Sequence, residues 1–209
     1  SAVSVGGSTI VAVVFATLCG FGAARFEFKG KNLLLGFLLV SQMFPAVMKI
    51  IPYYKTLRVL GMINSLSGLM IVYASFSIPF CTWMMYGYFR TIPKELDEAA
   101  EIDGASPFRT FLSVVMPLTL PGLIATTIYA FLQNWNEYMF ASVLMSGEAN
   151  KTLTVGIANM AGYYRILWND LMCGAIISSL PTVLISVFLQ KYLISGMPPV
   201  AVQRGRKSP

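Results

Sequence analysis

The chain has 209 residues, of which 56% are hydrophobic and 11% are charged, and its mean hydropathy is +0.68. This composition excludes an ordinary soluble globular domain and predicts a protein embedded in a lipid bilayer. The net charge of +6 does not indicate a nucleic-acid partner, because the basic residues form no long run and stand instead at the ends of apolar segments.

Uncharged stretches predict the membrane spans, in chain order residues 1–24, 32–48, 59–89, 110–136 and 171–190. All reach the roughly 20 residues that cross a hydrocarbon core, the second only when it is extended to residue 51. Backbone polar groups in lipid must be bonded internally, so the spans are expected to be helices. The sequence predicts one domain over residues 1–209, an all-α polytopic transmembrane bundle of five spans. Because Ser1 stands directly at an apolar run, we expect six spans in the intact subunit.

The charged connection between the third and fourth spans, residues 91–117, predicts two short helices separated by a turn. Thr91 is placed near the first N-cap, and acidic residues follow where the helix dipole favours negative charge. Gly104 is expected to end this helix, and Ser106 to cap the next. Helical spacing gives the first helix a narrow face of mostly small residues that suits close approach to a partner, namely Leu96, Ala99, Ala100 and Asp103.

The basic residues predict the orientation, because Lys and Arg in short loops favour the cytoplasmic side. Five spans place the two chain ends on opposite sides, and a cytoplasmic C-terminus leaves only a minority of the 15 Lys and Arg residues outside: Lys49, Lys55, Arg58, Lys151 and Arg165. Residues 91–117 and the tail, residues 196–209, are then cytoplasmic. The uncharged stretch 152–164 is too short to cross and too rich in Gly, Asn and Thr, so it is expected at the interface or as a re-entrant segment.

The charged connection carries fixed residue types at fixed spacing: Glu98-Ala99-Ala100, then Gly104, then Val114, Met116 and Pro117. This pattern resembles the EAA loop of binding-protein-dependent ABC importers. The flanking Ile92-Pro93 and residues 102–106 are similar to the carbohydrate-uptake, maltose-permease-like group of inner-membrane permeases, and so are residues 43–45, 51–52, 60–61, 79–80, 135–137 and 152–156.

The resemblance implies a permease subunit of the cell inner membrane of a bacterium or archaeon. It implies partners as well: a dimer of ABC ATPase subunits, a second permease and an extracytoplasmic solute-binding protein. In that family the EAA loop is seated in a cleft of the ATPase subunit. The coupling residues implied here are Glu98, Ala99, Ala100, Asp103, Gly104 and Pro117.

Polar residues inside apolar spans often mark a transport pathway, because they are costly in lipid. The densest such group lies late in the fourth predicted span: Gln133, Asn134, Trp135, Asn136 and Glu137. Amides and a carboxylate bond sugar hydroxyls, and Trp offers a flat apolar face. The alternative for this group is anchoring at the outer interface or packing against another helix.

Catalytic chemistry has no support in the sequence, which contains no His, no Gly-rich phosphate loop and no metal-ligand spacing among its three Cys residues. We therefore expect no catalytic site and no bound cofactor, with ATP and Mg used by the partner ATPase. The predicted function is coupling of ATP hydrolysis on that subunit to uptake of a sugar or related solute. The alternatives are an importer for an amino acid, polyamine or peptide, and an unpowered channel or carrier.

Overall fold

The computed structural model describes residues 1–147, 150–162 and 168–195. Its elements are helices joined by short connections. In chain order they are α1 (Ala2–Arg25), α2 (Lys31–Met43), α3 (Ala46–Val59), α4 (Leu66–Thr91), α5 (Glu95–Ile102), α6 (Pro107–Thr110), the π-helical turn η1 (Phe111–Val115), α7 (Met116–Leu118), α8 (Leu120–Trp135), α9 (Met139–Leu144), α10 (Leu153–Met160) and α11 (Trp168–Ser195).

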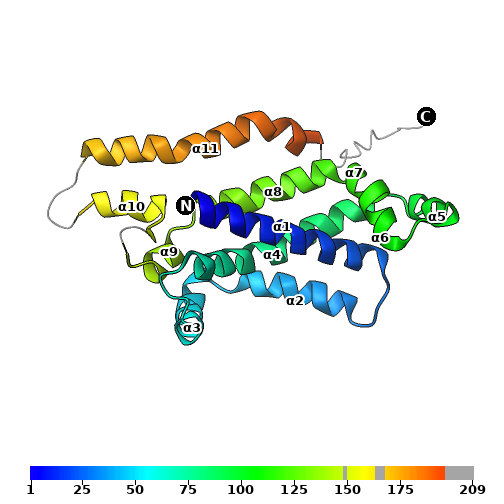
Figure 1. Cartoon of the computed structure of the whole chain (residues 1–209), viewed down its shortest axis with the longest axis horizontal. Helices are drawn as coiled ribbons and strands as arrows, with labels where there is room; N and C mark the ends of the chain where they lie inside the picture. Colours follow the sequence, from blue (N-terminus) through cyan, green and yellow to red (C-terminus); the bar gives the residue numbers. More distant parts are fainter. Residues whose placement is uncertain (148–149, 163–167, 196–209) are drawn as a thin grey trace, which may run out of the picture.

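Helices α1, α4 and α8 form the centre of the bundle, with α2 and α11 on opposite sides of them (Figure 1). The close packing of α1 on α4 follows from a row of small residues, one every four positions, that lets the two backbones approach. All members of this row are buried: Ser4, Ser8, Ala12, Ala16, Gly20 and Ala24. At Gly20 an added Cβ would lie 2.9 Å from the backbone nitrogen of Tyr86, so only glycine fits this crossing.

Three helices are long and apolar enough to cross a membrane, and they confirm the first, third and fifth predicted spans: α1, α4 and residues Trp168–Val187 of α11. The other two predicted spans are bent. The second is divided between α2 and α3, which meet at 101°, and the fourth between residues Pro107–Leu118 and α8, which meet at 79°. Five predicted spans are therefore matched when each bent pair counts as one span.

Prolines account for both bends. Pro45 disfavours helical backbone at Phe44, which is extended at ψ 124°, so α2 stops and α3 starts in a new direction. Pro121 stands in the first turn of α8, after Thr119 has left the α-helical path at ψ 2°. A 16-residue α8 spans only about 24 Å, shorter than the fourth span expected from residues 110–136.

The two-helix prediction for residues 91–117 is confirmed, with one correction at its start. Helix α4 continues through Thr91, whose hydroxyl donates a 2.7 Å hydrogen bond to the Tyr88 carbonyl, so Thr91 does not cap the next helix. Helix α5 begins at Glu95 after an N-cap position, Lys94, that makes no side-chain cap. Ser106 does cap α6, accepting from the Arg109 backbone N–H at 3.4 Å.

The two ends of the bundle carry different elements (Figure 1). One end holds α5 and α6, and the other holds α3, α9 and α10. Helix α10, only eight residues long and capped by Thr152, is too short to cross, as expected of the segment 152–164. Residues 163 and 164 of that segment, Arg165 and the predicted tail 196–209 lie outside the described residues.

Candidate coupling surface and solute cavities

Helix α5 ends in a turn that only Gly104 accommodates easily. Its backbone φ is +81°, in the left-handed region that favours glycine. The Gly104 N–H donates to the Glu101 carbonyl, and the Ala105 N–H to the Ala100 carbonyl, each at 2.9 Å. This is the Schellman pattern that closes a helix C-terminus. The turn presents the end of α5 at the extremity of the bundle (Figure 1).

The predicted coupling residues of α5 do not all face the same way. Glu98, Ala99 and Asp103 are exposed, but Ala100 is only 8% exposed and packs against the chain's own body. The predicted narrow face that included Ala100 is therefore corrected, because the side chain of Ala100 is buried within this chain. The surface left for a partner consists of Glu98, Ala99, Asp103 and Gly104.

Two exposed apolar side chains flank this surface, and the sequence analysis did not select them. Ile102 is 87% exposed and Phe108 66% exposed, on either side of the Gly104 turn. An apolar residue in a charged loop is the signal that could have revealed them, since such side chains are favoured where another protein covers them. We call Glu98, Ala99, Ile102, Asp103, Gly104 and Phe108 the α5 surface.

Pro117 lies apart from the α5 surface, in the short helix α7. Proline has no N–H to donate to the helical ladder, and the five residues before α7 form the π-helical turn η1. Phe111 and Val115 of η1 are buried beside Phe89 in one hydrophobic core cluster. Pro117 therefore belongs to the irregular connection that joins α6 to α8.

Arg25 links this connection to the membrane helices, and nothing in the sequence pattern singled it out for that role. It is the last residue of α1, and its side chain is 7% exposed. Its Nε lies 2.5 Å from Oδ2 of Asp97 on α5. Its Nη1 donates to the carbonyls of Phe89, at 3.2 Å, and Ile92, at 3.1 Å, at the end of α4.

The polar group proposed for the solute pathway lies at the other end of α8, and three of its members make structural contacts. Asn134 is buried and joins three helices, since its amide donates to Ser8 at 3.0 Å on α1 and accepts from Ser77 at 2.9 Å on α4. Trp135 donates from Nε1 to the Ser178 carbonyl of α11 at 3.0 Å. Glu137 accepts the backbone N–H groups of Phe140 and Ala141 and so caps α9.

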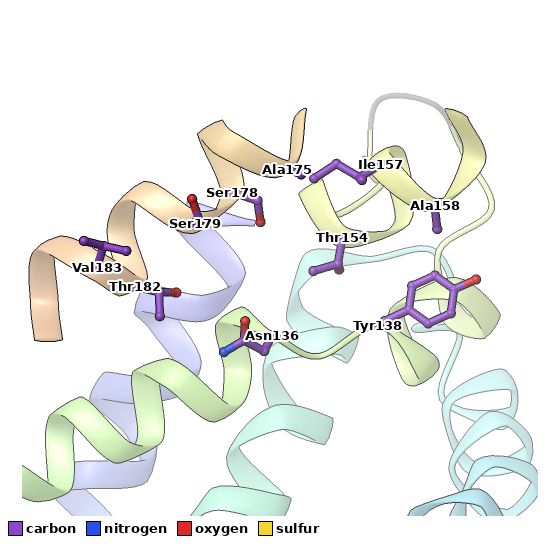
Figure 2. A pocket seen from close by; sticks show the side chains of 10 residues that line it. All are labelled: Asn136, Tyr138, Thr154, Ile157, Ala158, Ala175, Ser178, Ser179, Thr182 and Val183. Carbon is purple, nitrogen blue, oxygen red and sulfur yellow. The ribbon is translucent and has the colours of Figure 1, made fainter. Parts of the chain in front are cut away.

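Gln133 and Asn136, the exposed members of the group, open onto two different cavities. Gln133 lines one of about 200 Å³, together with Gln42, Tyr129, Asn134 and Glu137. Asn136 lines a larger one, of about 500 Å³, between the end of α8, α10 and α11. Figure 2 shows the hydroxyls of Thr154, Ser178, Ser179 and Thr182 around this space.

Both cavities combine amide or hydroxyl groups with apolar walls, a lining that suits a neutral polyhydroxylated molecule. Within residues 1–147, 150–162 and 168–195 there is no group of three His, Cys, Asp or Glu side chains that could hold a metal ion.

Comparison with known proteins defines first a class and then a family. The fold is that of an ABC-transporter permease: the structure of a bacterial ABC transporter involved in the import of the acidic polysaccharide alginate matches with a TM-score of 0.73 at 24% identity, over 92% of this chain and 74% of that one. Residues 12–201 match the family described as binding-protein-dependent transport system inner membrane component, and the chain belongs to that family.

Two of the relatives that match over most of the chain are sugar permeases by name. The trehalose/maltose transport system permease protein MalG of Thermococcus litoralis is 35% identical over 190 residues, which cover 90% of this chain and 68% of the relative. The trehalose transport system permease protein SugB of Mycobacterium tuberculosis is 32% identical over 198 residues, covering 94% and 72%. The chain is thus a multi-pass inner-membrane permease subunit of an ABC importer.

Proposed function

We propose that this subunit couples ATP hydrolysis on a separate ATPase subunit to import of a sugar. The observation that carries the proposal is the α5 surface: a short acidic helix closed at Gly104 stands exposed at one end of the bundle. Its residue Ala100 is buried, and its Asp97 forms an ion pair with Arg25 at the end of α1. A helix exposed on one side and anchored on the other transmits the movement of a docked partner to the spans.

The end of the bundle with α5 faces the cytoplasm in this proposal, and so does the C-terminus. Arg25, Arg90, Lys94 and Arg109 lie at the ends of helices there, or beside α5, in accord with the preference of basic residues for that side. A dimer of ABC ATPase subunits, using ATP and Mg, docks on the α5 surface. A second permease completes the pathway, and an extracytoplasmic binding protein supplies solute at the end with α3, α9 and α10.

The solute class is inferred from the cavities and from the relatives. Gln133, Asn136 and the hydroxyls beside them suit the many donors and acceptors of a sugar. The two relatives described above are named for trehalose or maltose. Trehalose and maltose are therefore the first solutes to test, with an amino acid as the counter-example.

The test is solute-stimulated ATPase activity of the complete transporter in liposomes, with binding protein present. Gly104→Asp places a side chain at φ +81°, which strains the turn by about 1–2 kcal/mol, and adds a negative charge to the α5 surface. Glu98→Lys reverses an exposed charge on the same surface. Both are expected to lower stimulation at least about tenfold, a loss of about 1.4 kcal/mol in coupling.

Matched controls lie in the loop between α1 and α2. Gly30→Asp introduces the same residue at another left-handed glycine, φ +92°, which like Gly104 has no atom within 4 Å of an added Cβ. Glu27→Lys reverses an exposed charge whose partner, Lys31, is four residues away. Normal stimulation in Gly104→Asp and Glu98→Lys, with normal insertion, would contradict the coupling role. An equal loss of solute-stimulated ATPase activity in the two control variants would show that any strained glycine or reversed charge lowers the stimulation, and would also contradict the coupling role.

A further inference from the structure

We infer that Arg25 is a positioning residue for coupling: its guanidinium holds α5 at a fixed place against the ends of α1 and α4, so that movement of the docked helix reaches the membrane helices. This inference deepens the proposed function and depends on it. The contacts that support it lie outside the EAA motif, at the last residue of the first described span.

The guanidinium meets three segments at once. Its Nε contacts Asp97 of α5, and its Nη1 bonds two carbonyls at the end of α4, Phe89 at 3.2 Å and Ile92 at 3.1 Å. Both carbonyls lie at the C-terminal end of α4, where helical N–H donors run out. The arginine bonds the Ile92 carbonyl and adds a second donor to the Phe89 carbonyl, which also accepts the Ile92 N–H at 3.3 Å. One side chain of α1 thus fixes both the end of α4 and the start of α5.

Helix α5 has few other attachments to the membrane helices. It packs against α6 and η1, which belong to the same connection, and its residue Ala100 is buried. Among the described residues, Asp97 is the member of α5 that forms an ion pair with a membrane-spanning helix. This pair ties α5 to the end of α1, in addition to its packing on α6 and η1.

The ion pair between Arg25 and Asp97 is largely buried. The side chains of Arg25 and Asp97 are 7% and 18% exposed, so water competes poorly for either charge. The planar guanidinium fixes the angles of its donors, whereas a lysine ammonium would supply a single rotatable charge. The Nε–Oδ2 contact is an ion pair without hydrogen-bond geometry, and Nη2 of Arg25 and Oδ1 of Asp97 have no bonding partner within the described part of the chain. The pair therefore fixes the position of α5 by charge attraction, without well-formed hydrogen bonds between the two side chains.

The test measures the place of α5 directly, in the complete transporter. Spin labels on Glu101→Cys in α5 and Leu33→Cys at the start of α2, both exposed positions, report the distance between the two helices. Cys19, Cys81 and Cys173 are first replaced by alanine, and the labelled transporter must retain normal stimulated ATPase activity. Arg25→Met is expected to broaden the distance distribution and to lower solute stimulation at least about fivefold, while unstimulated ATPase activity and complex yield stay normal.

Companion variants separate positioning from stability. Asp97→Asn keeps the shape of the side chain and removes its charge, so it should reproduce the defect even where Arg25→Met fails to fold. Arg25→Lys keeps the positive charge but lacks the planar guanidinium, so its distance distribution and solute stimulation should lie between those of the wild type and Arg25→Met. The double variant Arg25→Met with Asp97→Asn should be no worse than the more severe single variant, since both disrupt one contact. Lys31→Met removes the ion pair between Lys31 and the exposed Glu27, and its distance distribution and solute stimulation should match those of the wild type.

A narrow distance distribution with normal stimulation in Arg25→Met and Asp97→Asn would overturn the inference. So would a loss of unstimulated and stimulated activity in equal proportion, because that pattern marks a residue needed only for folding. Gly104→Asp separates the two proposals. If it leaves coupling intact, the proposed function fails; if it uncouples while Arg25→Met does not, only the role of Arg25 fails.

Discussion

Asp97 shows how one residue can connect burial, charge and the position of a helix. Burial raises the pKa of its carboxyl above 3.8; Arg25 and Lys94 oppose this rise and Glu101 adds to it. A folded-state pKa above the unfolded value means that the folded loop binds the proton more tightly. The contribution of this group to stability is therefore greatest below pH 3.8 and falls as the pH rises through the folded-state pKa.

Removal of Arg25 should make the position of α5 depend on pH. In Arg25→Met the charge that most strongly lowers the Asp97 pKa is gone, so the carboxyl stays protonated to higher pH and remains buried without a partner. The distance distribution between labels on α5 and α2 should exceed the wild-type width at about pH 5 and should be wider still at about pH 8, where more of the carboxyl is ionised. Asp97→Asn combined with Arg25→Met serves as the control and should give the same width at both values. An equally broad distribution throughout would contradict this reading.

Asn134 is expected to stabilise the folded bundle, since its side chain bonds α1 to α4. Replacing it by alanine removes bonds to Ser8 and Ser77 and leaves buried hydroxyls with fewer partners. We expect a loss of about 1–2 kcal/mol in the free energy of unfolding, measured by denaturant titration in detergent micelles. Gln133→Ala, one residue earlier and exposed, should cost less than about 0.5 kcal/mol. The assignment of Asn134 to packing would be wrong if the two variants were equally stable.

Among the helices, α1 and α4 depend on close approach at Gly20. Gly20→Ala would place a Cβ 2.9 Å from the Tyr86 backbone nitrogen and should destabilise the bundle by about 1–3 kcal/mol. Gly22→Ala meets no atom within 4 Å and should be neutral or stabilising, because alanine favours helix more than glycine does. Thermal unfolding of the two purified variants checks this. Similar melting temperatures would show that the crossing can relax.

The sequence predicts the straight spans well and the bends poorly. Helices α1, α4 and α11 follow from uncharged runs alone, because a bilayer leaves the backbone few alternatives. The divided spans do not, since Pro45 and Pro121 resemble prolines such as Pro79, which lies inside the continuous α4. Whether a proline bends a helix depends on its neighbours in space.

The candidate sites show the same limit. Gly104 was predictable because its role is local: a helix must stop there. The pairing of Arg25 with Asp97 was not, because it joins residues far apart in the chain through a contact that only the packed bundle creates. For the same reason, the single polar group at residues 133–137 separates into packing residues, a helix cap and the walls of two cavities.

The orientation of the whole molecule can be tested by labelling from either side of the membrane. With native cysteines replaced, Lys55→Cys on α3 should react with a membrane-impermeant maleimide in spheroplasts. Asp103→Cys on α5 should react only in inverted vesicles. Both positions are exposed and lie at opposite ends of the bundle, so each serves as the control for the other. The reverse pattern would place α5 outside and exclude docking of an ATPase there.

The wide turn η1 has a mechanical consequence for the molecule. Between α5 and α8 the regular helix is interrupted three times, by the Gly104 turn, by η1 and by the 79° bend, so these segments do not form one stiff helix. Aromatic rings connect η1 to the membrane helices instead: Phe21 of α1 lies 4.6 Å from Phe111 of η1 and 5.5 Å from Phe89 of α4 between ring centres. In the proposed coupling, a displacement of α5 would reach α1 and α4 through these contacts between aromatic rings, and smaller side chains in their place should weaken the transmission while each helix stays folded.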